Sequence, residues 1–479
     1  MHSSSLFAKN MVIQIAGRVI AVLIGLFSIA ILTRYLTTEQ FGEYTTTVTF
    51  LQFFGVLVDF GLTLTLVVMI SEQGADEKKI VGNLLSLRLL IGAILFALAP
   101  LLVLLFPWSE TVKMAVLFGA IGYWLMGGAS LLVGVFQKHA CMWRAAVAEL
   151  LNRTVLVLFI LFFVFLHLGV VAMVTTTIAA SGAWLLFLIL FAKPFVQIRP
   201  RFDWMVWKRA FSKSWPIAIS ILFNLMYLKG DILFLSLYRP QTDVALYGAT
   251  YRILDVMTAL PTMFMGLLLP TLVATWSAGK KGEFKQHLTR AFDLFMITLF
   301  PIIVGAQIVG TPLMIFIAGK NYEASGVILQ LLILAVAGVF FGALFGHTVV
   351  AINKQRLMTL GYALVAILSV VGYFWLIPPY GIWGAVWVTL FSEGMIALLT
   401  FLVVWKTTRI LPNLVVTGKA LLASFVMFFF LLSFPSIHVL IDVLLGALIY
   451  LVVMIMIKGI RASEIRTLLP NRFVRIPRE

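Results

Sequence analysis

Apolar runs of about twenty residues recur from one end of this 479-residue sequence to the other, separated by short charged turns. A helix rises about 1.5 Å per residue, so each run is long enough to cross the roughly 30 Å hydrocarbon core of a membrane. Hydrophobic residues make up 62% of the chain and charged residues only 11%, whereas soluble proteins are about 25% charged. The sequence therefore predicts an all-α membrane protein without a sizeable soluble domain.

Hydropathy predicts about fourteen transmembrane helices. Their approximate bounds are 9–34, 41–70, 80–106, 112–137, 145–167, 170–192, 209–236, 243–276, 285–310, 323–352, 357–377, 380–405, 417–434 and 437–457. An even number places both termini on one side, and 26 of the 35 lysines and arginines lie on that side. Because basic loops resist translocation, this side is expected to be cytoplasmic. The opposite side has only Arg34, Lys113, Arg239 and Lys320.

The two halves of the sequence carry similar short motifs in the same order. The matched motifs are Phe41-Gly42 with Tyr247-Gly248, Gln137-Lys138 with Asn353-Lys354-Gln355, and Gly169 with Gly381. They predict two six-helix bundles, an N-terminal lobe at 1–195 and a C-terminal lobe at 213–408, joined by a cytoplasmic linker at 196–212. Two further helices at 409–458 and a basic cytoplasmic tail at 459–479 follow. Such paired bundles are typical of transporters that alternate access around a site between their halves.

Polar residues recur at helical spacing in the first two spans of each predicted lobe. Ionisable groups inside a membrane are costly, so these stripes are expected to line a common cavity. The candidates for this lining are Gln14 and Arg18 in the first span, Gln52 and Asp59 in the second, Asn224, Lys229 and Asp231 in the seventh, and Tyr251, Arg252 and Asp255 in the eighth.

Some of these charges have competing structural interpretations. Arg252 and Asp255 are three residues apart and could pair within their own helix. Lys229 falls nearly opposite Asp231 on an ideal helix unless Gly230 distorts it. Arg88 lies near the cytoplasmic boundary, where its guanidinium is expected to extend to the interface.

The sequence lacks the usual motifs of enzymes. The six histidines are scattered over different segments without metal-ligand spacing, and the only cysteine is Cys141. There is also no phosphate-binding Gly-x-x-x-x-Gly-Lys motif, so ATP-driven transport is not expected. No cofactor and no metal ion are expected either. The net charge of +16 is explained by cytoplasmic loops, so nucleic acid is not an expected partner.

Asn10-Met11 and the run from Thr33 to Tyr44 (Thr-Arg-Tyr-Leu-Thr-Thr-Glu-Gln-Phe-Gly-Glu-Tyr), together with the matched turns, resemble the Wzx-type polysaccharide-biosynthesis flippases. These belong to the multidrug/oligosaccharidyl-lipid/polysaccharide superfamily. The resemblance implies movement of an undecaprenyl-diphosphate-linked oligosaccharide of O-antigen, capsule or exopolysaccharide from the cytoplasmic to the periplasmic leaflet of the bacterial inner membrane. It also implies a cationic cavity, an expectation that falls here on Arg18, Lys229 and Arg252 as substrate-binding residues.

Two further expectations concern coupling and partners. Asp59 or Asp255 is a candidate site for a coupling proton or sodium ion, although each could instead neutralise a nearby cation. A glycan polymerase or other assembly proteins are candidate partners.

Three other functions stay open from the sequence. A multidrug or organic-cation antiporter of the same superfamily would be favoured by an excess of acidic over basic cavity residues. A membrane glycan polymerase or ligase, and a scaffold without transport activity, are the remaining alternatives.

Overall fold

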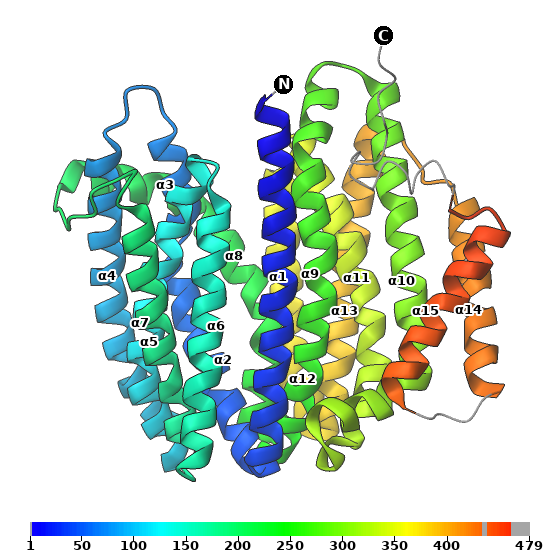
Figure 1. The fold of residues 1–479 in the computed structure, drawn as a ribbon, viewed down its shortest axis with the longest axis horizontal. Helices are drawn as coiled ribbons and strands as arrows, with labels where there is room; N and C mark the ends of the chain where they lie inside the picture. The colour runs from blue at the N-terminus through cyan, green and yellow to red at the C-terminus, as the bar shows by residue number, and fades with distance from the viewer. Residues whose placement is uncertain (1, 434–437, 461–479) are drawn as a thin grey trace. The chain divides into compact units, whose positions relative to one another are not determined.

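The computed structural model describes residues 2–433 and 438–460, and for residues 2–16, 18, 19, 216, 217 and 220 it describes the backbone alone. Every regular element in these ranges is helical (Figure 1). The α-helices are α1 (His2–Tyr35), α2 (Thr38–Asp59), α3 (Leu62–Ile70), α4 (Glu77–Leu102), α5 (Glu110–Lys138), α6 (Met142–Phe165), α7 (Val170–Ala192), α8 (Trp204–Tyr238), α9 (Gln241–Ser277), α10 (Lys281–Ala318), α11 (Ala324–Ala351), α12 (Gln355–Tyr380), α13 (Ile382–Thr408), α14 (Val415–Ser433) and α15 (Val439–Met456).

These helices confirm the prediction of an all-α membrane protein. In the described residues, thirteen helical segments are long and apolar enough to cross a membrane. The shorter apolar stretch Ile20–Tyr35 of α1 is a further candidate, which matches the expected number of about fourteen.

The second predicted span, 41–70, differs from the structure because it is broken into α2 and α3. Phe60 and Gly61 both have positive φ values, 43° and 70°. The carboxylate of Asp59 accepts hydrogen bonds at the break from the Gly61 N–H, at 3.2 Å, and from the Thr63 hydroxyl, at 2.6 Å. Glycine adopts this left-handed conformation without a steric penalty, so Gly61 and the capping carboxylate together allow the interruption.

The predicted linker, 196–212, is partly helical, because α8 begins at Trp204. The Asp203 carboxylate caps this helix by accepting hydrogen bonds from the N–H groups of Met205 and Val206, at 2.9 and 3.4 Å. An aspartate at this position satisfies backbone donors that have no partner within the helix, which explains where the helix starts.

The chain folds into two units, each with its own packed helices. The first comprises Met1–Val256, Ile317–Ser325 and Thr359–Ser392, and the second comprises Met257–Phe316, Gly326–Met358 and Glu393–Glu479. In the first unit, α5 packs against α2, α3, α4 and α7, and α6 packs against α1 and α7 (Figure 1). In the second unit, α14 and α15 pack against each other. The arrangement of the helices as two six-helix bundles stays a prediction.

The matched turns after α5 and α11 share a helix-ending geometry that also ends α6, α9 and α15, so the repeat stays a prediction. After α5, Ala140 has a φ of 51°, and after α11, Asn353 has a φ of 58°. Each turn is closed by the same pair of backbone hydrogen bonds, Ala140 to Gln137 and Cys141 to Phe136 in one, Asn353 to Val350 and Lys354 to Val349 in the other. The turns therefore have the same helix-ending geometry. Gly169 and Gly381 differ, since only Gly381 has a positive φ, of 57°.

Candidate functional site

Asp231 in α8 is fully buried and is held by hydroxyl groups from three side chains. Its Oδ2 accepts hydrogen bonds from Tyr247 at 2.7 Å, from Thr389 at 3.1 Å and from Tyr251. Its Oδ1 accepts the backbone N–H of Ile232 at 2.8 Å. A buried carboxylate needs such partners, since leaving it without them would be costly. Asp231 is thus a fixed structural centre that joins α8, α9 and α13.

Lys229, two residues earlier, forms an ion pair with Asp255 of α9 rather than interacting with Asp231 directly. Its Nζ lies 2.9 and 3.2 Å from the two Asp255 carboxylate oxygens. The same ammonium lies 4.6 Å from the centre of the Tyr251 ring, a favourable cation–π distance. Tyr251 therefore links Asp231 to the ion pair, because its hydroxyl donates to Asp231 and its ring contacts the ammonium of Lys229.

The ion pair differs from Asp231 in its accessibility. The side chain of Lys229 is 20% exposed and that of Asp255 is 45% exposed, whereas Asp231 is 0% exposed. An accessible ion pair can exchange one partner for a charged ligand at a lower cost than a buried pair can. In the structure Asp255 pairs with Lys229, whereas the sequence also allowed it to pair with Arg252.

Arg252 lies one residue after Tyr251 in α9 and is partly buried. Within the described part of the chain its side chain forms no ion pair and no hydrogen bond. It is close enough to the hydroxyls of Tyr44 in α2 and Tyr123 in α5 to interact with them electrostatically. A guanidinium in a membrane helix without an acidic partner has the chemistry needed to bind an anion.

Asp59 and Arg88 form a second charged centre. The guanidinium of Arg88 donates to the Asp59 carboxylate, to Ser130 at 2.8 Å and to Thr63 at 3.3 Å. Arg88 is 3% exposed, so its guanidinium does not extend to the membrane interface, and our expectation on this point was wrong. The ion pair and the cap at Gly61 assign Asp59 a structural role, and a role in ion coupling stays a prediction.

The remaining predicted residues are distributed as follows. The side chains of Gln14 and Arg18 lie outside the described part of the structure, so their roles stay predictions. Gln52 is partly buried in α2. The amide of Asn224 donates to the Tyr227 hydroxyl at 2.5 Å, about one helical turn before Lys229.

Sequence patterns did not identify Thr389 or Tyr373 as parts of this centre. Tyr373 in α12 donates its hydroxyl to the Tyr227 backbone oxygen at 3.0 Å, and its ring lies against Gly230, where an added Cβ would be 3.1 Å away. Thr389 also donates to its own helix, at Ala385. These residues are 146 and 158 positions away from their partners in α8, a separation that no local sequence pattern bridges.

The starts of α2 and α9 cross closely through the glycines of the matched motifs. A Cβ at Gly42 would lie 1.9 Å from the Gln241 backbone oxygen, and a Cβ at Gly248 would lie 2.5 Å from the Thr45 side chain. The Thr46 hydroxyl also donates to the Gln241 side chain at 2.7 Å. The two glycines make reciprocal contacts, so only residues without a side chain allow this approach.

Further hydrogen bonds join helix ends at the same end of the first unit as the starts of α2 and α9. Arg34 donates to the Ile317 oxygen at 2.5 Å, Tyr35 to the Leu168 oxygen at 2.9 Å, and the Trp108 indole to the Ser236 oxygen at 3.1 Å. These contacts all lie within the first unit. They therefore connect the helix ends of the first unit at this end.

The opposite end of the first unit is held by ion pairs to the segment that precedes and begins α8. Glu72 pairs with Arg209 and Lys213, and Lys79 pairs with Asp203 at 2.6 Å. The hydrogen bond from Lys213 lowers the pKa of the Glu72 carboxyl below its usual value, and the hydrogen bond from Lys79 does the same to the pKa of Asp203. Both acids are therefore ionised at neutral pH. The Trp207 indole adds a hydrogen bond to the Asn83 oxygen at 3.0 Å.

Two proteins of related sequence are named for O-antigen transport and for succinoglycan biosynthesis transport. The chain is 24% identical to an O-antigen transporter of Shigella dysenteriae over 376 residues, which cover 76% of this chain and 92% of the relative. It is 22% identical to the succinoglycan biosynthesis transport protein ExoT of Rhizobium meliloti (strain 1021) over 320 residues, which cover 64% of this chain and 62% of the relative.

Solved structures share the fold. The lipid II flippase MurJ, in an inward closed conformation, has a TM-score of 0.75 at 15% identity, and the match covers 93% of this chain and 99% of that chain. An inward-facing multidrug resistance MATE family transporter of the MOP superfamily has a TM-score of 0.68 at 14% identity, covering 84% and 98%. At these identities the likeness establishes the fold alone. The family described as polysaccharide biosynthesis protein matches residues 7–276, more than half of the sequence, and the chain therefore belongs to this family.

Proposed function

We propose that the protein is a flippase that moves an undecaprenyl-diphosphate-linked oligosaccharide from the cytoplasmic to the periplasmic leaflet of a bacterial inner membrane. The cargo would be a repeat unit of O-antigen, capsule or exopolysaccharide. The family and the transport functions named for the two relatives support this proposal. The single observation that carries it is Arg252, a membrane-helix cation without an acidic partner among the described residues.

Lys229 and Arg252 are the groups that would bind the diphosphate. The Asp255 carboxylate occupies the position beside Lys229 that a phosphate oxygen could take, so cargo binding would exchange one anion for another. Asp255 would then lose this ion pair and become a site for a proton or a sodium ion. In this mechanism cargo entry and ion binding are linked through one lysine.

Alternating access supplies the movement in this proposal. The sugars and diphosphate would lie among the polar helices while the polyprenyl chain stays in lipid. The reciprocal glycine contacts between α2 and α9 would separate when the cargo leaves on the outer side. Both termini are assigned to the cytoplasm, because the positive-inside distribution favours that orientation.

A flipping assay with purified protein in liposomes tests the proposal. The probe is undecaprenyl-diphosphate-linked oligosaccharide, and its arrival in the far leaflet is measured by cleavage with a membrane-impermeant glycosidase. We expect Lys229→Met and Arg252→Met each to lower the flipping rate about tenfold or more, since a charged hydrogen bond contributes about 1.5–3 kcal/mol. Lys280→Met is the matched control, because Lys280 belongs to an exposed pair with Glu283. Wild-type rates in both test variants would contradict the role of the cations.

The same liposomes can test the antiporter alternative by measuring exchange of an organic cation for protons. Lys229 and Arg252 accompany Asp231 and Asp255 at the site, so acidic residues do not exceed basic ones. An organic-cation antiporter would exchange ethidium for protons and would leave the lipid-linked probe in place. Glycosyl transfer by the purified protein would instead favour a polymerase or ligase and would contradict transport without chemistry.

A further inference from the structure

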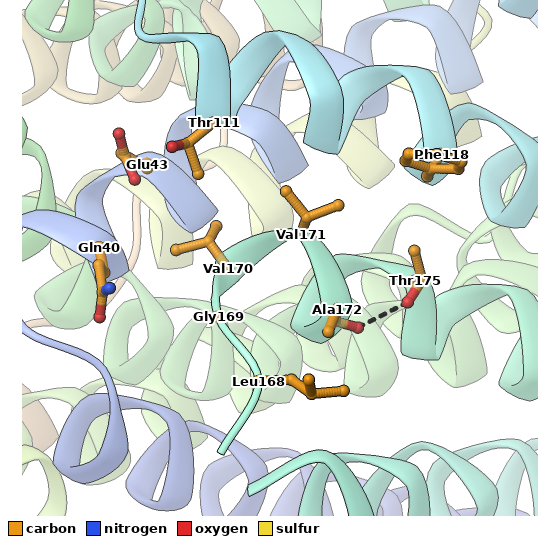
Figure 2. A pocket seen from close by; sticks show the side chains of 10 residues that line it. All are labelled: Gln40, Glu43, Thr111, Phe118, Leu168, Gly169, Val170, Val171, Ala172 and Thr175. Carbon is orange, nitrogen blue, oxygen red and sulfur yellow. Dashed lines mark hydrogen bonds between the residues drawn. The ribbon is translucent and has the colours of Figure 1, made fainter. Parts of the chain in front are cut away.

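The first unit contains an open cavity of about 570 Å³ at the starts of α2, α5 and α7, separate from the Lys229 centre. Figure 2 shows the side chains that line it. Ten residues line it, and the polar ones among them are Gln40, Glu43, Thr111 and Thr175. The volume is within the range of about 300–1,000 Å³ that is typical of small-ligand sites. These three helix starts follow turns that the proposed orientation places outside the cell.

Glu43 is the acidic group of this cavity, and its residue is only 8% exposed. Its Oε1 accepts a hydrogen bond from the Ser109 hydroxyl at 2.5 Å, and Ser109 is in turn the N-cap of α5. The second oxygen, Oε2, accepts no hydrogen bond from the described residues. Ser109 thus fixes the carboxylate at the cavity wall and leaves one oxygen available to a donor.

The other polar groups of the cavity complement Glu43. The Gln40 side-chain oxygen accepts the Thr37 N–H at 3.1 Å, which leaves the amide nitrogen available as a donor. The Thr111 hydroxyl makes no hydrogen bond to a described residue. Thr175 donates to the Ala172 oxygen at 2.7 Å, so its oxygen can still accept (Figure 2). The cavity therefore presents donors and acceptors together.

The chemistry of the lining indicates which ligand it suits. None of the ten residues is basic, so a phosphate or another anion would find no counter-charge. Acceptors, donors and the 39% exposed ring of Phe118 suit a sugar, whose hydroxyls form hydrogen bonds and whose C–H face packs on an aromatic ring. A lipid amine would use Glu43 and leave the amide and hydroxyl groups unmatched.

We propose that this cavity is a glycan-binding site on the outer side of the protein, and that it holds a sugar of the oligosaccharide cargo near the exit. This inference rests on the proposed function for the identity of the sugar. It assigns Gln40 and Glu43, two residues of the motif that first suggested the family resemblance, a direct role in cargo recognition.

Binding of a lipid-free sugar tests the inference independently of transport. The full chain in lipid nanodiscs is titrated with the repeat-unit oligosaccharide released from the source organism's surface polysaccharide, and the Kd is measured by microscale thermophoresis. We expect Glu43→Gln to raise the Kd roughly tenfold and Thr111→Val roughly threefold. Glu43→Gln keeps an acceptor for Ser109, and Thr111→Val preserves shape, so the second variant carries the test if the first is unstable.

Two matched controls make the result specific. Glu110→Gln removes an exposed carboxylate that adjoins Thr111 but does not line the cavity, and Thr154→Val removes an exposed hydroxyl on α6. Both should leave the Kd unchanged within about twofold. An unchanged Kd in Glu43→Gln and Thr111→Val would overturn the inference, as would selective binding of phosphoethanolamine in place of the oligosaccharide.

The flipping assay separates this inference from the proposed function. Flipping that depends on Lys229, combined with sugar binding that ignores Glu43, would overturn the glycan site alone. Sugar binding that depends on Glu43, without any flipping, would support the glycan site and contradict the flippase function.

Discussion

Two aspartates inside membrane helices, Asp59 and Asp231, are stabilised in different ways. Asp59 in α2 pairs directly with Arg88, a 3% exposed arginine that also reaches Ser130 and Thr63. Asp231 in α8 is surrounded by the hydroxyls of Tyr247, Tyr251 and Thr389. Its neighbour Lys229 pairs with another acid, the exposed Asp255.

The difference separates a structural charge from an available one. The Asp59–Arg88 pair lies beside a helix break and has little accessible surface on the arginine, so separating it would leave an uncompensated charge in the protein. The Lys229–Asp255 pair is partly exposed, so we expect it to change partners at a lower cost than the buried pair. The hydroxyl shell of Asp231 holds Tyr251 in place and so fixes the position of the cation.

The largest effect is expected for Arg88→Leu. Removing the arginine leaves the Asp59 carboxylate without its counter-charge, and we expect the free energy of unfolding in mixed detergent micelles to fall by about 3–5 kcal/mol. The double variant Arg88→Leu with Asp59→Asn should recover a large part of this loss, because both charges of the pair are then gone. A single variant as stable as the wild type would show that the comparison between the two acids is incorrect.

A smaller effect, on transport rather than stability, is expected at the second pair. Lys229→Met combined with Asp255→Asn removes both charges of the pair, so the melting temperature should stay near that of the wild type. Flipping should remain reduced by about tenfold or more, since the anion-binding cation is gone. If the double variant flips at the wild-type rate while Lys229→Met alone does not, the pair is structural in the same sense as Asp59–Arg88.

The smallest effect is expected for the hydroxyl shell. Tyr247→Phe and Tyr251→Phe each remove one of the hydroxyl hydrogen bonds to Asp231, and we expect each to lower the free energy of unfolding by about 1 kcal/mol. The Tyr251 ring remains beside Lys229 in Tyr251→Phe, so flipping should fall less than about threefold. A large loss of flipping at unchanged stability in Tyr251→Phe alone would mean that its hydroxyl acts directly on the cargo.

Hydropathy and turn signals predicted the membrane helices well. Each span forms its backbone hydrogen bonds within its own helix, and its length can be read from the length of the apolar run. The break at Phe60–Gly61 was missed, since a single glycine in an apolar run does not reveal that a neighbouring carboxylate caps it. Candidate charges were found by the same reasoning, because an ionisable residue in an apolar run is conspicuous.

The sequence by itself determined that this chain is a helical membrane protein and which of its helices carry charge, because hydrophobicity and helical spacing are local properties. Only the tertiary structure decided the partners: Arg88 with Asp59, Lys229 with Asp255, and Thr389 with Asp231 across 158 positions. The physical reason is that a buried charge is stabilised by any partner that packing brings to it, and helix packing rather than sequence distance decides which one is within reach.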